Sequence, residues 1–140
     1  MALVSKSFDR AIQFVWTGKA WLPLIKVAIV SPNLRRLDLA LLFDTGSDQL
    51  LLHPDWETFF PPASLKPKDF TGIGGTALGK NTRGQIILFG RTITCDIGFG
   101  PKGMEAPDPP MAGIIGRECF KTFGFGFWEA AHELYVKLRP

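Results

Sequence analysis

The sequence predicts an all-β domain with one short helix near its C-terminal end. Its apolar residues occur in short runs, which are typical of buried strands. Fifteen glycines and eleven prolines in 140 residues favour short strands joined by turns over a helical bundle. A hydrophobic content of 46% and a charged content of 21% are typical of a folded protein. We therefore expect a single domain over residues 1–140, in which residues 1–20 form an N-terminal extension or a first strand.

The first half of the chain is predicted to alternate between strands and turns. β-forming and apolar residues indicate strands at residues 11–16, 21–30, 35–43 and 50–52, with turns at 17–20 and 31–33. A short helix is expected to begin at Pro54, because proline suits the first helical turn. Pro61 and Pro62 end that helix, and residues 63–69 are interpreted as a polar connection.

The second half is predicted to contain a mobile hairpin, three strands, the helix and a closing hairpin. Three glycines surround Ile73 within residues 70–78, which suits a hairpin tip that closes over a ligand. Residues 117–123 form the best helix candidate, and Gly124 ends it. The remaining expected elements are strands at 85–89, 92–99 and 112–116, a proline-rich loop at 100–111, and a hairpin built from 125–128 and 133–138.

Composition and charge exclude several classes of function. The net charge of +3 is spread along the chain without a basic run, so we expect no nucleic-acid partner. The most apolar stretch, residues 21–30, is too short to span a bilayer, and the N-terminus lacks the pattern of a signal peptide, so we expect a cytoplasmic protein without a membrane partner. Cys95 and Cys119 match no disulfide framework or zinc spacing and are expected to be buried free thiols. We expect neither a metal nor another cofactor.

An aspartate between two apolar runs is the strongest candidate for chemistry. Residues 39–43 and 50–52 flank the sequence Asp44-Thr45-Gly46-Ser47. A carboxylate at the end of a buried strand is costly to desolvate, so it requires nearby hydrogen-bond donors or a function. Thr45, Gly46 and Ser47 offer such donors. Asp44 is therefore interpreted as a catalytic carboxylate, and the competing interpretation is an aspartate that only caps a turn.

Three motifs in order resemble the retropepsin-type aspartic proteases, a single-lobe family with retroviral, retrotransposon and bacterial members. The motifs are Phe43-Asp44-Thr45-Gly46-Ser47, then Gly72-Ile73-Gly74-Gly75, then Ile114-Ile115-Gly116-Arg117. The resemblance extends from about Trp21 to Leu138. It implies a closed β-barrel or sandwich with a short C-terminal helix and a flap hairpin. It also implies an aspartic endopeptidase that acts on polypeptides.

The resemblance assigns a role to each matching residue. Asp44, Thr45 and Gly46 correspond to the catalytic motif, in which Thr45 braces the active-site loops across a dimer axis. Substrate-binding positions are Ser47, Asp48, Gly72, Ile73, Gly74, Gly75 and Ile114. Ser47 is expected to donate a hydrogen bond to Asp44, and Ile73 is expected at the flap tip. Asp48 and Arg117 correspond to positions that form a partly buried ion pair between the turn and the helix.

The chemistry of peptide hydrolysis requires a second carboxylate. One group must take a proton from water while another gives a proton to the substrate. Two adjacent carboxylates do both, because they share one proton. The chain has a single Asp-Thr-Gly, so the pair requires two copies of Asp44 in a symmetric homodimer. The hairpin at 125–138 departs from the small viral members and indicates a different dimer interface.

Alternative interpretations remain open at the level of sequence. A non-catalytic retropepsin-like module for dimerisation or peptide binding would carry the same motif. Residues 74–80 fit G-x-x-x-x-G-K, and residues 72–77 fit G-x-G-x-x-A, but neither lies in the strand–loop–helix context of a phosphate-binding loop. His53 and His132 are interpreted as loop or surface residues, and the four tryptophans as core or interface residues.

Overall fold

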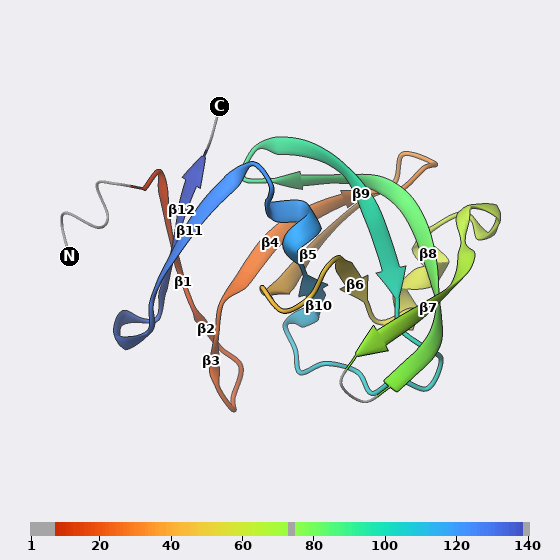
Figure 1. Ribbon diagram of the computed structural model, residues 1–140, viewed down its shortest axis with the longest axis horizontal. Helices are drawn as coiled ribbons and strands as arrows, with labels where there is room; N and C mark the ends of the chain where they lie inside the picture. The colour runs from red at the N-terminus through yellow and green to blue at the C-terminus, as the bar shows by residue number, and fades with distance from the viewer. Residues whose placement is uncertain (1–7, 73–74, 139–140) are drawn as a thin grey trace.

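The computed structural model describes residues 8–72 and 75–138, and its architecture is all-β with a few short 3-10 helices (Figure 1). The largest sheet has seven strands in the order β4-β5-β10-β6-β9-β8-β7. A further pairing of β4 with β8 closes the strands between them into a ring. Its strands are β4 (Leu24–Val30), β5 (Arg36–Phe43), β6 (Leu50–Leu52), β7 (Lys66–Gly72), β8 (Gly75–Leu88), β9 (Arg91–Phe99) and β10 (Met111–Ile115).

The core lies inside this ring and explains the sequence pattern of its strands. Along β5, Leu39, Leu41 and Phe43 are buried while their neighbours are more exposed, which is the period of two of a half-buried strand. By contrast, β4 is buried at nearly every position except Lys26. The ring therefore accounts for both the alternating and the continuous apolar runs.

Parallel pairing of β5 with β10 positions the functional turn. Ile115 on β10 lies opposite Phe43 on β5, so both strands end at the same edge of the sheet. Asp44 follows one strand and Gly116 follows the other. The backbone N–H of Asp44 donates to the carbonyl of Ile115 over 3.1 Å, which joins the two strand ends.

A second sheet of three strands joins the two ends of the described chain. Its order is β1-β12-β11, and Figure 1 shows it beside the ring. The strands are β1 (Arg10–Gln13), β11 (Phe123–Trp128) and β12 (Glu133–Leu138), and a small hairpin is formed by β2 (Val15–Trp16) and β3 (Trp21–Leu22). The hairpin of residues 125–138 is thus confirmed, and part of residues 1–20 is a strand paired with β12.

Several sequence predictions need correction. The helix expected at 117–123 is only a 3-10 turn, η3 (Arg117–Phe120), because Phe123 already pairs with β12. Residues 63–69 are no simple connection, since β7 begins at Lys66 after two 3-10 turns, η1 (Pro54–Phe59) and η2 (Pro62–Ser64). The strand expected at 85–89 extends back to Gly75. That extension places residues 75–80 in β8 and rules out a phosphate-binding loop there.

Both histidines lie in connections between elements, as expected, but His53 is not on the surface. His53 is buried, and it caps η1 by accepting from the N–H of Asp55 over 3.1 Å. Its Nε2 lies 2.8 Å from the carbonyl of Met104, which fixes the proline-rich loop. Of the two locations expected for the tryptophans, the core is excluded for Trp16 and Trp21, which are about half exposed, and Trp21 stacks on His132.

The structure offers neither a membrane span nor a metal cluster within the residues it describes. None of the helices in residues 8–72 and 75–138 has the length and apolarity to cross a bilayer. Over the same residues, histidine, cysteine and acidic side chains do not gather in groups of three or more that would hold a metal ion.

The only tyrosine of the chain, Tyr135, is hydrogen-bonded within the three-stranded terminal sheet. The Tyr135 hydroxyl donates to the carboxylate of Glu133, which also accepts from Gln13 of β1 over 3.0 Å. The bond to Glu133, followed by burial, raises the pKa of Tyr135, and the bond from Tyr135 lowers the pKa of Glu133. The stabilisation from Tyr135 is therefore present below its ordinary pKa and lost as pH rises through the raised one. The stabilisation from Glu133 is present above the ordinary pKa of glutamate and is lost as pH falls through the lowered pKa of the folded state.

We predict that the phenolate absorbance of the folded protein titrates above the range of free tyrosine. In Glu133→Gln the carboxylate is absent, so the pKa of Tyr135 should move back toward its ordinary value. An ultraviolet pH titration of both proteins measures this. An identical midpoint in wild type and Glu133→Gln would contradict the assignment.

The two cysteines are free, buried and in contact. A hydrogen bond to Cys119, followed by burial, raises the pKa of the Cys95 thiol, which stays protonated at neutral pH. Since the thiolate is the reactive form, we expect no reaction of the folded protein with a thiol-specific reagent. Two thiols should react after unfolding in guanidinium. Rapid labelling of the native protein would show that this part of the core opens readily.

Candidate active site

The Asp44 turn is built from hydrogen bonds between neighbouring backbone groups. Asp44 is half-buried, and its Oδ1 accepts from the backbone N–H of Gly46 over 2.9 Å. The N–H of Ser47 donates to the carbonyl of Asp44 over 3.3 Å. The carboxylate is thus held by a donor two residues away, as its position at the end of a buried strand requires. Thr45 is exposed beside it.

The segment after β10 fixes the same turn from the other side. The N–H of Arg117 donates to the carbonyl of Ser47 over 2.9 Å, and the N–H of Glu118 donates to the carbonyl of Asp48 over 2.8 Å. A Cβ on Gly116 would lie 2.5 Å from the carbonyl oxygen of Ser47, so only glycine permits this approach. The apolar-apolar-Gly motif therefore packs against the Asp44 turn and holds it by backbone hydrogen bonds.

Two expected side-chain contacts turn out differently. Asp48 and Arg117 do form an ion pair, but their side chains are 85% and 63% exposed, so the pair is not partly buried. An exposed ion pair stabilises little, and the backbone bonds of η3 contribute more. The hydroxyl of Ser47 donates to the carbonyl of Gln49 over 3.0 Å instead of to Asp44.

A cleft of about 740 Å³ lies between the Asp44 turn and the β7–β8 hairpin. Its floor is formed by Asp44, residues 46–49, Leu51 and Ile114, and its roof by residues 68–71 and 75–77. The structure thus brings together Asp44, Gly46, Ser47, Asp48, Gly75 and Ile114. Thr45 is not among the described residues that line the cleft, and the predicted roles of Gly72, Ile73 and Gly74 stay untested because the surroundings of these three residues are not described.

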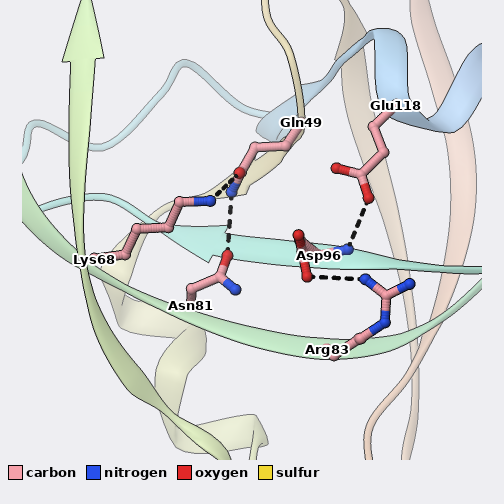
Figure 2. Close-up of polar contacts among 6 residues, drawn as sticks. All are labelled: Gln49, Lys68, Asn81, Arg83, Asp96 and Glu118. Carbon is pink, nitrogen blue, oxygen red and sulfur yellow. Dashed lines mark hydrogen bonds and ion pairs between the residues drawn. The ribbon is translucent and has the colours of Figure 1, made fainter.

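Three further residues line the cleft without any sequence motif that marks them: Gln49, Lys68 and Phe70. Lys68 on β7 donates through Nζ to Gln49 Oε1 over 2.7 Å, and Gln49 Nε2 donates to Asn81 Oδ1 on β8 over 3.3 Å (Figure 2). Phe70 lies beside them over the backbone of β9, where a Cβ on Gly98 would be 2.8 Å from its ring. The three polar residues come from distant parts of the sequence, so no local pattern marks them.

A neighbouring polar group ties η3 to the sheet. Arg83 on β8 pairs with Asp96 on β9 at 3.1 Å, and the N–H of Asp96 donates to Glu118 Oε1 over 3.4 Å (Figure 2). The segment that seats the Asp44 turn is therefore itself held against β9. The turn is supported through two successive layers of hydrogen bonds.

The fold is that of a retropepsin-like protease. The chain superposes on the solved structure of EIAV protease complexed with the inhibitor HBY-793, with a TM-score of 0.52 and 22% identity. The match covers 76% of this chain and 92% of the EIAV protease chain. No protein-family model and no curated protein matches the sequence. At this level of identity the likeness establishes the fold.

Proposed function

We propose that the protein is an aspartic endopeptidase that acts as a homodimer on polypeptides. The observation that carries this proposal is the position of Asp44, half-buried at the floor of a cleft that the β7–β8 hairpin covers. A carboxylate held by the N–H of Gly46 and facing a cleft of this size suits a peptide substrate. The cytoplasm is the proposed compartment, in keeping with two buried free thiols.

The proposed mechanism uses two copies of Asp44 and one water molecule. One Asp44 takes a proton from water as the oxygen attacks the scissile carbonyl carbon, and the protonated partner donates to the carbonyl oxygen. The resulting tetrahedral intermediate collapses as an Asp44 carboxyl protonates the departing nitrogen. The substrate lies extended between floor and roof and is bonded through its backbone like an added strand.

A second copy is needed because each of the other carboxylates that line the described cleft is either bound in an ion pair or absent from the cleft floor. Asp48 is paired with Arg117, and Asp69 is exposed on the β7–β8 hairpin instead of on the floor. A single protomer therefore offers Asp44 as its one candidate acid or base on the floor. The acid–base pair requires a symmetric partner.

The free edge of β11 is the surface that we propose for this partner. The backbone N–H of Phe14, just after β1, donates to the carbonyl of His132, just before β12. By the alternation of an antiparallel pair, the backbone N–H and C=O groups of even-numbered β12 residues therefore point to β1, and those of odd-numbered residues point to β11. The odd-numbered residues of β12 pair with Gly124, Gly126 and Trp128. The backbone groups that point to the free edge are consequently those of Phe123, Phe125 and Phe127.

This edge lacks the features by which strands avoid association. β7, at the edge of the large sheet, carries Lys66, Pro67 and Lys68, and β1, at the other edge of the terminal sheet, carries Arg10. β11 has the sequence Phe-Gly-Phe-Gly-Phe-Trp without charge or proline. Among the described residues, β12 is its only paired strand. Antiparallel self-pairing of β11 would satisfy the edge around a two-fold axis.

The same edge lies close to the Asp44 turn. Phe43, the residue before Asp44, contacts Phe125 and Phe127 with ring centroids 4.6 and 5.2 Å away. Phe127 is also 45% exposed, which is high for a large apolar side chain. Pairing of two β11 strands would therefore bring two Asp44 turns toward one axis.

A peptide library tests the proposed activity. Wild type and Asp44→Asn are incubated with random peptides from mildly acidic to neutral pH, and cleavage sites are identified by mass spectrometry. Internal cleavage by wild type alone supports the proposal. A wild type that stays monomeric at micromolar concentration and cleaves nothing would favour the alternative, a non-catalytic peptide-binding module.

A further inference from the structure

Lys68 is the cation in the cleft wall. It is half-buried on β7 and lines the same cleft as Asp44. Its Nζ lies 2.7 Å from Gln49 Oε1 and 5.5 Å from the centroid of the Phe70 ring. Both neighbours are uncharged. Within residues 8–72 and 75–138, no carboxylate forms an ion pair with Lys68.

The contacts of Lys68 hold its position without neutralising its charge. Gln49 is fixed in turn, because its Nε2 donates to Asn81 and a Cβ on Gly98 would lie 2.4 Å from that nitrogen. Figure 2 shows Lys68 and Asn81 both bonded to the side-chain amide of Gln49. An ammonium group has three donors, and Gln49 occupies one of them. The others are available to a ligand.

Three carboxylates of the described residues line the cleft, Asp44, Asp48 and Asp69, and none of them forms an ion pair with Lys68. Asp48 is paired with Arg117. Asp69, the next residue on β7, is exposed in the roof of the same cleft and does not pair with Lys68. In a partly desolvated cleft, a cation that bonds only an amide attracts an anionic group more strongly than it would in water.

We propose that Lys68 selects substrates with a glutamate or aspartate side chain at the position that faces it. This inference rests on the proposed function, because it assigns a preference to the same cleft. In a symmetric dimer the second Lys68 faces the other half of an extended substrate. The preference therefore applies at positions equally far from the scissile bond on both sides, with apolar contacts from Phe70, Leu51 and Ile114 between them.

Matched peptides test the inference. Library cleavage locates the position, and peptides that differ only in glutamate, glutamine or lysine there are then compared by kcat/KM. A charge-assisted hydrogen bond predicts a preference of about tenfold or more for glutamate over glutamine in wild type. The preference should fall to about twofold or less in Lys68→Gln, remain in Lys68→Arg, and shift to lysine in Lys68→Glu. Added salt should weaken it.

Lys66→Gln is the matched control. Lys66 lies two residues earlier on β7, is exposed and does not line the cleft, so its removal changes the net charge equally without changing the preference. The same peptides are also tested for binding to Asp44→Asn by fluorescence anisotropy. Cleavage with no glutamate preference, or a preference that survives in Lys68→Gln, would overturn the role of Lys68 alone. Neither cleavage nor binding of any peptide would overturn the proposed function and this inference together.

Discussion

Asp44→Asn is expected to lower kcat/KM for peptide cleavage by at least about 10⁴-fold, because it removes both the general base and the general acid. The fold should persist. Asparagine retains an oxygen that accepts from the N–H of Gly46, so the turn keeps its 2.9 Å bond. The measurement compares initial rates on one peptide from the library, with circular dichroism and sedimentation as checks on fold and assembly.

Asp38→Asn serves as the control for this substitution. Asp38 lies on β5, the strand that Asp44 follows, but it is exposed, pairs with Arg36 and does not line the cleft of Asp44. Its activity should equal that of wild type. Cleavage by purified Asp44→Asn at a wild-type rate would refute the mechanism.

Mixing the two proteins tests whether each site needs two copies of Asp44. At equal amounts, random exchange leaves about one quarter of the dimers with two aspartates. Activity per wild-type chain should then fall to about half. An activity that stays proportional to the amount of wild type would mean that one protomer suffices.

Phe127→Pro is expected to weaken the dimer by more than about tenfold, while Phe127→Ala has a smaller effect. Both variants lose the aromatic ring, but only proline also removes an N–H that points to the free edge of β11. Two-fold symmetry removes that donor twice, at about 1 kcal/mol for each hydrogen bond. Sedimentation velocity over a concentration series gives the dissociation constants.

Ala11→Pro is the corresponding control on the opposite edge. Ala11 is an exposed residue of β1, and its N–H points away from β12 by the same alternation. Its dimer should be as stable as that of wild type. Equal dissociation constants for Phe127→Pro and Phe127→Ala, or dissociation caused by Ala11→Pro, would assign the interface to another surface.

The parts of the site that sequence predicts are those within contiguous motifs. The Asp44 turn and the Gly116 segment that supports it each consist of a strand end followed by small or hydrogen-bond-donating residues. A few neighbouring positions are therefore enough to predict them. The hairpin roof is likewise marked by its glycines. What joins these segments is parallel pairing of β5 with β10, which follows from the resemblance to a fold and not from local pattern.

The missed features depend on pairing between distant residues. The contact of Lys68 with Gln49 arises because β7 folds over the floor, and a lysine in a polar stretch carries no sign of that position. The helix expected at 117–123 is shortened to the 3-10 helix η3 for the same reason. Helix propensity over seven residues is weak, and pairing of Phe123 with Leu138 outweighs it. The burial of His53 in its loop has no local signal either, because its Nε2 contacts the carbonyl of Met104, 51 residues along the chain.

The pairing of β1 with β12 has a consequence for the timing of synthesis. Gln13 and Glu133 are 120 residues apart, so β1 leaves the ribosome long before its partner strand exists. β12 is also the hairpin partner of β11, and contacts this distant in sequence form late because they close a long loop. A nascent chain would therefore lack the terminal sheet and its association surface until β12 emerges. Under the proposed mechanism, a nascent chain can neither dimerise nor cleave peptides until β12 has been synthesised.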